Sequence, residues 1–352
     1  MTRNLAILSV KDEGAFLLEW LAHHQVVGFT DFLIFSNDCV DGTDLMLDRL
    51  EKMGHITHVN HRAKPDKSVQ WQAMKKAAKH SLLKEADWIL ALDIDEFVNI
   101  HIEDNSLTAL IDSLPEPDAI TLTWRLFGNA GVVDFQDVPV TEQFTQCAPK
   151  RILWPWRASM FKTLYRNNGI YCKPGIHRPI APDQSRVDDA RWFDGSGRLL
   201  GADHRRKRIF SDYTQDTTTR VQINHYALGA MASFLLKRAR GRGVHFDEQI
   251  GMDYWVDYNL NSEQDFSIFR YQTARAERVA EFKSDATLLK LHEKAFEWRQ
   301  KRFSELLEQE TERAFYARLL MTGQTTPLTE HTARQLISIA MRANQKAASS
   351  PE

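Results

Sequence analysis

The chain has 352 residues, which is enough for one large α/β domain or two smaller domains with a buried core. Hydrophobic residues make up 43% of it and charged residues 26%, as in an average soluble globular protein. The net charge of −2 creates no global field that favours nucleic acid or an anionic membrane, so we expect no nucleic-acid partner. The three cysteines show no CxxC spacing, which argues against a disulfide framework and a zinc knuckle.

The first residues, "MTRNLAILSVKDEG", contain too short an apolar run for a signal peptide. No apolar stretch approaches the roughly 20 residues that a membrane-spanning helix requires. We therefore expect a reduced, cytoplasmic protein without a transmembrane segment. Peripheral association with the inner face of the membrane stays open, because composition does not exclude it.

The first 130 residues alternate between strand-like and helix-like patterns. Alternation at this spacing predicts βαβ units, and therefore a Rossmann-like, mostly parallel sheet flanked by helices. The predicted strands are 5–10, 32–37, 56–61, 88–92 and 119–127. The predicted helices begin near residue 14, span 45–53, 70–84 and 107–114, and follow apolar residues at helical spacing.

The rest of the chain has a different texture. Residues 130–225 contain six prolines and short strand-like runs, which is typical of a segment that shapes a cleft. Residues 273–321 are charged and carry apolar residues at helical spacing, which predicts a long amphipathic helix or a helix pair. We expect a catalytic domain at 1–245, a helical extension at 246–340 that offers a surface for homo-oligomerisation, and a disordered tail at 341–352.

Two acidic clusters follow predicted strands. Asn37, Asp38 and Asp41 follow the second strand, and Asp93, Asp95 and Glu96 follow the run "WILAL". In an open α/β sheet, ligands bind outside the carboxyl ends of the strands, so the two clusters indicate one bipartite site. The first cluster also suits a polar turn that caps the next helix, and the second also suits a solvated surface turn.

A D-x-D pair on an extended segment presents two carboxylates on one face, because alternate side chains share a side. Such oxygen ligands suit Mg²⁺ or Mn²⁺ with water and phosphate in the remaining positions. Two enzyme classes use nearly this string. In haloacid-dehalogenase-like phosphatases, a Thr or Val stands at the position of Phe97 and the motif normally opens the fold, so "DIDEF" fits that class poorly.

Four motifs in order resemble the family-2-like glycosyltransferases, especially the subgroup with a DxDEF metal motif and the related family 92. They are "LSVKDEGAFLLEWLAHHQVVGFTDFLIFSNDCVDGT", "DIDEF", the "W…FG" at Trp124, Phe127 and Gly128, and "INHYALGAMASFLLKRARGRG". The chain has Asp12 where the family commonly has Asn, and Cys39 and Val40 where it has small polar residues. The resemblance covers about 1–245 and implies the A-type nucleotide-diphospho-sugar transferase fold.

The resemblance also implies roles for individual residues. Metal coordination falls to Asp93, Asp95 and His225, with Mn²⁺ or Mg²⁺ as the cofactor. Asp93 is also implied at the ribose or a metal-bound water, and Glu96 near the acceptor as a catalytic or supporting group. Binding of the nucleotide-diphospho-sugar donor falls to Glu13, Asn37, Asp38, Asp93, His177, Lys237 and Arg240. Lys237, Arg240 and Arg242 equally suit an ordinary basic helix end.

The implied reaction is an inverting transfer of a sugar to a hydroxyl acceptor of a glycan, polysaccharide or glycolipid. Negative charge develops on the leaving diphosphate, where a divalent cation stabilises it. A carboxylate must accept the proton of the acceptor hydroxyl. We favour Asp183 over the other acidic residues of this half, which are Asp188, Asp189, Asp247, Glu248 and Asp253. A metal-dependent phosphatase or nucleotidyltransferase and a catalytically silent sugar-nucleotide-binding scaffold remain as alternatives.

Overall fold

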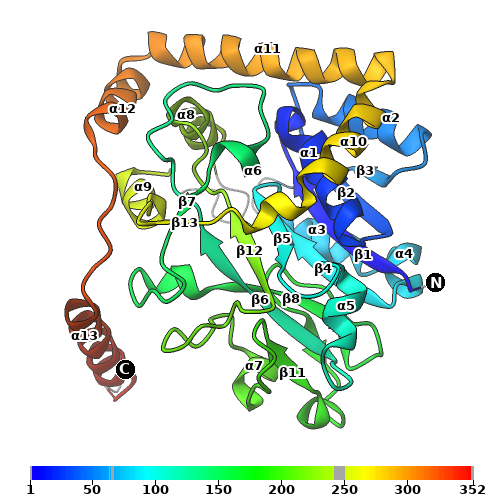
Figure 1. Ribbon diagram of the computed structural model, residues 1–352, viewed down its shortest axis with the longest axis vertical. Coiled ribbons are helices and arrows are strands. Elements are labelled where there is room, and N and C mark those ends of the chain that lie inside the picture. Colours follow the sequence, from blue (N-terminus) through cyan, green and yellow to red (C-terminus); the bar gives the residue numbers. More distant parts are fainter. Residues whose placement is uncertain (1, 63, 65–66, 242–249, 350–352) are drawn as a thin grey trace.

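The computed structural model describes residues 2–62, 64, 67–241 and 250–349 (Figure 1). The strands are β1 (Asn4–Val10), β2 (Asp31–Ser36), β3 (Thr57–Asn60), β4 (Trp88–Leu92), β5 (Glu96–Ile100), β6 (Ala119–Leu126), β7 (Gln146–Cys147), β8 (Phe161–Arg166), β9 (Tyr171–Lys173), β10 (Ile180–Pro182), β11 (Trp192–Asp194), β12 (Val221–His225) and β13 (Glu263–Gln264). The helices of the first half are α1 (Gly14–Val27), α2 (Thr43–Lys52), α3 (Val69–Ala77), α4 (Ser81–Glu85), α5 (Leu107–Asp112) and α6 (Val140–Gln143), with the 3₁₀ turns η1 (Trp156–Ser159) and η2 (Val187–Asp189). The later ones are α7 (Ala202–Arg206), α8 (Met231–Arg240), α9 (Met252–Tyr258), η3 (Ser267–Tyr271), α10 (Gln272–Lys283), α11 (Ala286–Glu308), α12 (Glu310–Met321) and α13 (Glu330–Ser349).

A nine-stranded sheet organises the described part of the chain. Its strands follow the order β3-β2-β1-β4-β8-β6-β12-β5, and β11 pairs with β6 beside that path. Strands β3, β2, β1 and β4 are parallel, whereas β8 runs antiparallel between β4 and β6. The expected α/β class with a mostly parallel central sheet, flanking helices and C-terminal helices is confirmed.

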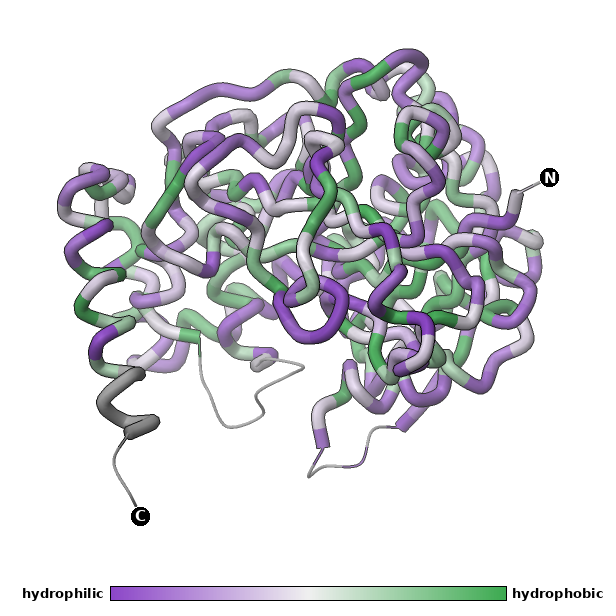
Figure 2. The backbone as a smooth tube through the Cα atoms, turned by 90° about the horizontal axis from the view of Figure 1, so that it is seen from below, coloured by the Kyte–Doolittle hydropathy of each residue, from purple (hydrophilic) through white to green (hydrophobic). Residues whose placement is uncertain are grey.

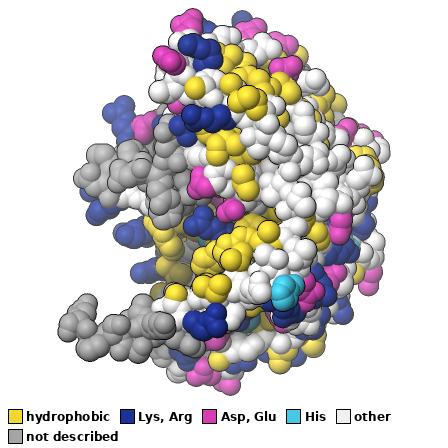
Figure 3. Space-filling view, turned by 90° about the vertical axis from the view of Figure 1, so that its left-hand side faces the viewer, with side chains coloured by type: hydrophobic (Ala, Val, Ile, Leu, Met, Phe, Trp, Pro, Cys, Tyr) yellow, Lys and Arg dark blue, Asp and Glu magenta, His cyan; other side chains and the backbone are white. Residues whose placement is uncertain are grey.

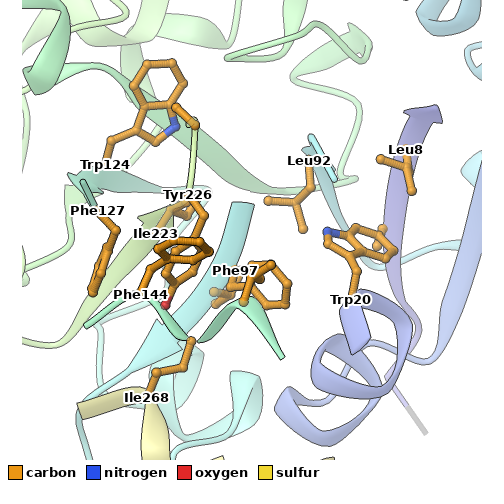
Figure 4. Packing of buried hydrophobic residues seen from close by; sticks show 14 of the residues in the cluster. Leu8, Trp20, Leu92, Phe97, Trp124, Phe127, Phe144, Ile223, Tyr226 and Ile268 are labelled. Carbon is orange, nitrogen blue, oxygen red and sulfur yellow. The ribbon is translucent and has the colours of Figure 1, made fainter. Parts of the chain in front are cut away.

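Side chains of β1 alternate between two cores, which explains how one apolar strand supports both faces of the sheet. Ala6 and Leu8 belong to the core under α1 and α2, whereas Leu5 and Ile7 belong to the core under α3 and α4. Figure 4 shows part of the larger core, where Trp20 of α1 lies beside Leu92 of β4. The carboxyl end of β4 is thereby fixed from one side.

The predicted helix at 70–84 is divided into α3 and α4. The ring of His80 accepts a hydrogen bond from the Leu82 N–H at 3.3 Å and caps a new helix there. Side-chain capping of this kind competes with continuation of a helix, and it was not visible in the apolar spacing.

The C-terminal helices form a connected series, in place of the one helix or pair that the sequence predicts. Figure 1 shows α11 across one end of the molecule, with α12 turning back and α13 at the end of an extended connection. Figure 2 shows hydrophobic and hydrophilic residues alternating along α13. The predicted disordered tail at 341–352 overlaps α13, which continues to Ser349, and residues 350–352 lie outside the described residues. Within the described residues, no helix has the length and apolar character needed to cross a bilayer.

Candidate functional site

A pocket of about 410 Å³ opens at the carboxyl ends of β1, β2 and β4. This is the edge at which open α/β sheets bind ligands. Among the residues expected at the site, eight line the pocket: Glu13, Asn37, Asp93, Asp95, His177, His225, Lys237 and Arg240. The structure therefore brings together side chains that are up to 227 positions apart.

The D-x-D segment is a tight turn between β4 and β5, and our expectation of an extended segment is wrong. The Glu96 N–H donates to the Asp93 carbonyl at 3.1 Å, which closes the turn. Trp20 Nε1 donates to the carbonyls of Asp93 and Glu96, both at 3.1 Å. The turn is possible because β5 reverses direction and joins the sheet beside β12.

Glu96 is a buried support of this turn. Its carboxylate is fully buried and accepts hydrogen bonds from Trp124 Nε1 at 2.7 Å and from the Asp93 N–H at 2.9 Å. Burial raises the pKa of Glu96 above its ordinary value. A fully buried carboxylate does not reach an acceptor in the pocket, so the expected catalytic role of Glu96 is not supported by its position.

Lys162 of β8 supplies a positive charge behind the acidic turn. Its side chain is 1% exposed, and Nζ lies 2.9 Å from Asp93 Oδ2 and 3.4 Å from Glu96 Oε2. Burial alone would lower the pKa of Lys162, but the charges of Asp93 and Glu96 raise it above its ordinary value. The lysine therefore stays charged and partly neutralises the cluster. The local sequence "FKTLYR" gave no sign of this role.

Both carboxylate oxygens of Asp93 have partners in the protein. Gln70 Nε2 donates to Oδ1 at 2.7 Å, and Lys162 occupies Oδ2. Fewer carboxylate lone pairs of Asp93 are therefore available to a cation than the resemblance implies. Gln70, like Lys162, was missed because nothing in its local sequence distinguishes it from other polar residues of a helix.

Asp95 faces His225 and Lys237. Asp95 Oδ1 lies 3.7 Å from His225 Nε2, and Lys237 Nζ donates to Oδ2 at 2.8 Å. Burial would raise the pKa of Asp95, but the charge of Lys237 and the contact with His225 hold it well below its ordinary value. The carboxylate is therefore ionised at neutral pH.

Strand pairing fixes the backbone of His225, and an aromatic contact fixes its ring. It lies at the end of β12 opposite Glu96 of β5, and its centroid is 4.3 Å from the Trp124 ring. Asp95 and His225 thus present one oxygen and one nitrogen to the pocket from two fixed strand ends. A carboxylate and an imidazole at this spacing suit Mn²⁺ or a similar divalent ion, so these two residues fit the implied metal.

A different group meets the geometric requirement for three metal ligands among the described residues. Asp12, Cys39 and Asp41 have ligand atoms within 4.8 Å of one another. Their polar atoms serve the backbone: Asp41 accepts from the N–H groups of Gly14 at 3.0 Å and Thr43 at 2.8 Å, and Asp12 accepts from the Val40 N–H at 2.7 Å. Asp41 therefore caps the starts of α1 and α2.

Glu13 and Arg240 form a pair on the pocket wall. Arg240 contacts the Glu13 carboxylate and the Lys11 carbonyl. Arg299 of α11 approaches the same carboxylate at 3.4 Å and lies between the rings of Phe16 and Phe135. The helical extension thus reaches a pocket residue, which no local pattern in the sequence indicated. Arg242 lies outside the described residues.

His177 is neutral at the pocket wall. Burial and the nearby charge of Lys162 lower its pKa to about 4. Its Nδ1 lies 3.1 Å from the Phe161 carbonyl, which suits a donated hydrogen bond and fixes the tautomer. His177 is therefore a neutral hydrogen-bonding group at neutral pH and offers no positive charge to a diphosphate.

Three expected site residues do not line the pocket, and one of them is the buried Glu96 described above. Asp38 is exposed at the tip that follows β2, and Asp183 accepts hydrogen bonds from the Ser185 N–H at 2.9 Å and Oγ at 2.7 Å. Asp183 starts the turn that leads into η2, and its role as a general base stays a prediction. Asp247 and Glu248 lie outside the described residues. The acids that line the described pocket are Glu13, Asp93 and Asp95, and each has a basic partner.

One family of known proteins matches part of the chain. The model of glycosyltransferase family 92 matches residues 10–181, a range that holds the acidic turn, Lys162 and His177. This match supports a glycosyltransferase with an A-type-like domain. No curated protein matches the chain.

Solved structures give weaker similarities. S. aureus TarS 1-349 is 15% identical with a TM-score of 0.31, and the match covers 47% of this chain and 47% of TarS 1-349. Its complex with UDP is also 15% identical, with a TM-score of 0.30 and the same coverage. HddC from Yersinia pseudotuberculosis is 11% identical with a TM-score of 0.26, over 38% of this chain and 64% of HddC. The chain thus spans about half the length of the TarS structure.

Proposed function

We propose that the protein transfers a sugar from a nucleotide-diphospho-sugar donor to a hydroxyl group of a glycan, polysaccharide or glycolipid. The observation that carries this proposal is the pairing of Asp95 with His225 in a pocket that also contains Lys237 and Arg240. A carboxylate and an imidazole suit a divalent cation, and two basic side chains suit the diphosphate that the cation would share.

Asp95 Oδ1 and His225 Nε2 would hold Mn²⁺ or Mg²⁺ in this proposal. Such an ion supplies Lewis-acid stabilisation of the negative charge that develops on the leaving diphosphate. Asp93 does not fit as a direct ligand, because Gln70 and Lys162 occupy its oxygens. We assign it to the ribose or to a metal-bound water, held at a fixed position by Lys162.

The chain's own cations add to this stabilisation. Lys237 and Arg240 lie on α8 and line the pocket, so both can attract the diphosphate and remain beside it as the sugar departs. Glu13 and Asn37 lie at the ends of β1 and β2, where the nucleoside is expected. A single displacement with inversion requires a base on the acceptor side, for which Asp183 is the residue to test first.

The test is the release of nucleotide diphosphate from a panel of nucleotide sugars, with and without Mn²⁺. The wild-type protein should release the diphosphate slowly from one donor, and Asp95→Asn and His225→Gln should each lower kcat by at least roughly 100-fold, because the leaving charge loses its partner. Asp112→Asn changes an exposed carboxylate on α5 and serves as the matched control.

Three outcomes would contradict the proposal in different ways. Release of inorganic phosphate from phosphoesters would favour a phosphatase. Binding of nucleotide sugars without turnover, unchanged in Asp95→Asn, would favour a silent binder. Full activity after exhaustive chelation would exclude the metal-dependent part alone.

If Asp183→Asn keeps wild-type kcat at saturating acceptor, Asp183 is not the base.

A further inference from the structure

Trp156 is an exposed aromatic side chain beside the pocket. Its residue is 51% exposed, and its ring stacks on Phe210 with centroids 5.0 Å apart and an interplanar angle of 23°. The other face of the ring is open to a ligand, and the residue that follows it in sequence, Arg157, lines the pocket.

The position of Trp156 follows from the direction of β8. Because β8 is antiparallel to β4 and β6, its first residue lies at the edge where those two strands end. The turn η1 immediately precedes β8, so Trp156 is at the same edge as the acidic turn. Two neighbours in this segment, Arg157 and Met160, line the pocket.

The stack is held by backbone pairing. The Ser211 N–H donates to the Ser159 carbonyl at 2.7 Å, and the Phe161 N–H donates to the Ile209 carbonyl at 3.3 Å. Met160 and Phe210 form an antiparallel bridge between the same segments. Ser159 Oγ also donates to the Trp156 carbonyl at 2.8 Å. Trp156 and Phe210 therefore form a platform whose orientation does not depend on a ligand.

The platform adjoins the side of the pocket that β8 and β6 supply, through its neighbours Arg157 and Met160. The ends of β1 and β2 supply Val10 and Asn37 on one side of the acidic turn. The β8–β6 side supplies Trp124, Arg157 and Met160, and it lies beyond β4 in the strand order. A nucleoside on the first half leaves the second half for the group that accepts the sugar.

We infer that Trp156 is a stacking platform for a pyranose ring of a carbohydrate acceptor, with Arg157 as a hydrogen-bond donor to its hydroxyl groups. This inference rests on the proposed function and deepens it by assigning the residues that bind a sugar ring of the acceptor. The flat C–H face of a pyranose matches an indole ring, and its equatorial hydroxyls reach outward to polar groups such as a guanidinium.

The first test measures carbohydrate binding without any donor. Maltohexaose, cellohexaose, chitohexaose and mannohexaose are titrated into the wild-type protein, with Trp156→Ala and Trp156→Phe in parallel. One of the four should bind the wild type, Trp156→Ala should weaken that binding roughly ten-fold, and Trp156→Phe should restore most of it, as expected for loss and recovery of stacking. Phe266→Ala is the matched control, because Phe266 is also 51% exposed and, unlike Trp156, has no neighbour in sequence that lines the pocket.

The second test separates this inference from the proposed function. With the bound oligosaccharide as acceptor, Trp156→Ala should raise the acceptor KM roughly ten-fold, while the affinity for the nucleotide and the hydrolysis of the donor stay at wild-type levels. Absence of binding to all four oligosaccharides, or equal binding by wild type and Trp156→Ala, overturns the inference. Weakened nucleotide binding in Trp156→Ala also overturns it, because Trp156 would then stack on the nucleobase. Oligosaccharide binding without any donor turnover would leave the platform intact and reject the transferase.

Discussion

Lys162 shows how one residue determines the arrangement of the acidic turn. Its ammonium group lies between Asp93 and Glu96 and is almost fully buried. The pair of carboxylates and the lysine form a buried charge network, and such networks are costly to break by removal of one member. The lysine also determines which oxygens of Asp93 remain for a ligand.

Replacement of Lys162 by Met should lower the free energy of unfolding by about 3 kcal/mol at pH 8, because the buried carboxylate of Glu96 and the half-buried one of Asp93 lose their positive partner. Urea denaturation with wild type and variant in parallel measures this difference. The double variant Lys162→Met/Glu96→Gln should regain a large part of the loss. A single variant as stable as the wild type would show that these ion pairs contribute no net stability.

At the scale of elements, α1 is joined to β5 by a buried histidine. His24 Nδ1 lies 2.8 Å from the Trp20 carbonyl, and its Nε2 accepts from the Val98 N–H at 3.4 Å. Because Nε2 is used as an acceptor, a second proton has no place on the ring. Burial accordingly lowers the pKa of His24 to about 3.

This pKa predicts a loss of stability in mild acid. The unfolded chain binds a proton at His24 below pH 6.5, whereas the folded protein does not until about pH 3, so stability falls as the pH falls through this window. Between pH 6.5 and pH 5, protonation of His24 in the unfolded chain should lower the free energy of unfolding by about 2 kcal/mol. The measurement is the free energy of unfolding against pH for wild type and His24→Gln. A slope that is equal in both would contradict the assignment.

The elements also show what the sequence could and could not reveal. Strands β1, β2 and β4 and the acidic residues after them follow from apolar runs and polar stops, so the sheet and the place of the pocket were predictable. Glu96 was predicted near the acceptor but is buried, because its side chain points inward when the D-x-D segment turns. Closure of that turn depends on β5 and β12, which are distant in sequence from one another. Lys162 and Arg299 were missed because they reach the site through tertiary packing, from a strand and a helix without any local motif.

At the scale of the molecule, the C-terminal helices differ in how firmly they are attached. Phe315 and Leu319 of α12 are buried, and Arg238 of α8 pairs with Glu312 at 3.2 Å. The segment 328–341 instead exposes apolar side chains: Leu328, Leu336, Ile339 and Met341. Figure 3 shows hydrophobic and basic side chains interspersed on the face that lies at the left of Figure 1, where α12 and α13 are found. Association through these helices stays a prediction.

Removal of residues 327–352 should therefore change the free energy of unfolding by less than about 1 kcal/mol, because few buried contacts are lost. Removal of residues 310–352 should cost several times more, because Phe234 and Arg238 lose the cover of Phe315. Urea denaturation of the two truncated proteins gives both values. If the shorter truncation is the more damaging one, α13 is an integral part of the fold.

The two lysines beside the acidic turn have a consequence for the resting protein. Lys162 and Lys237 already balance Asp93 and Asp95 before any ion or donor arrives, so folding does not require a bound metal. Exhaustive treatment with EDTA should leave the thermal midpoint of the wild type unchanged, and Mn²⁺ should raise it only by its own binding energy. In Lys237→Met, where Asp95 lacks its counter-charge, the same Mn²⁺ concentration should raise the midpoint further. The protein would then be fully folded before substrate binding. Binding of the donor and its metal ion would only change the partners of Asp95 and Lys237.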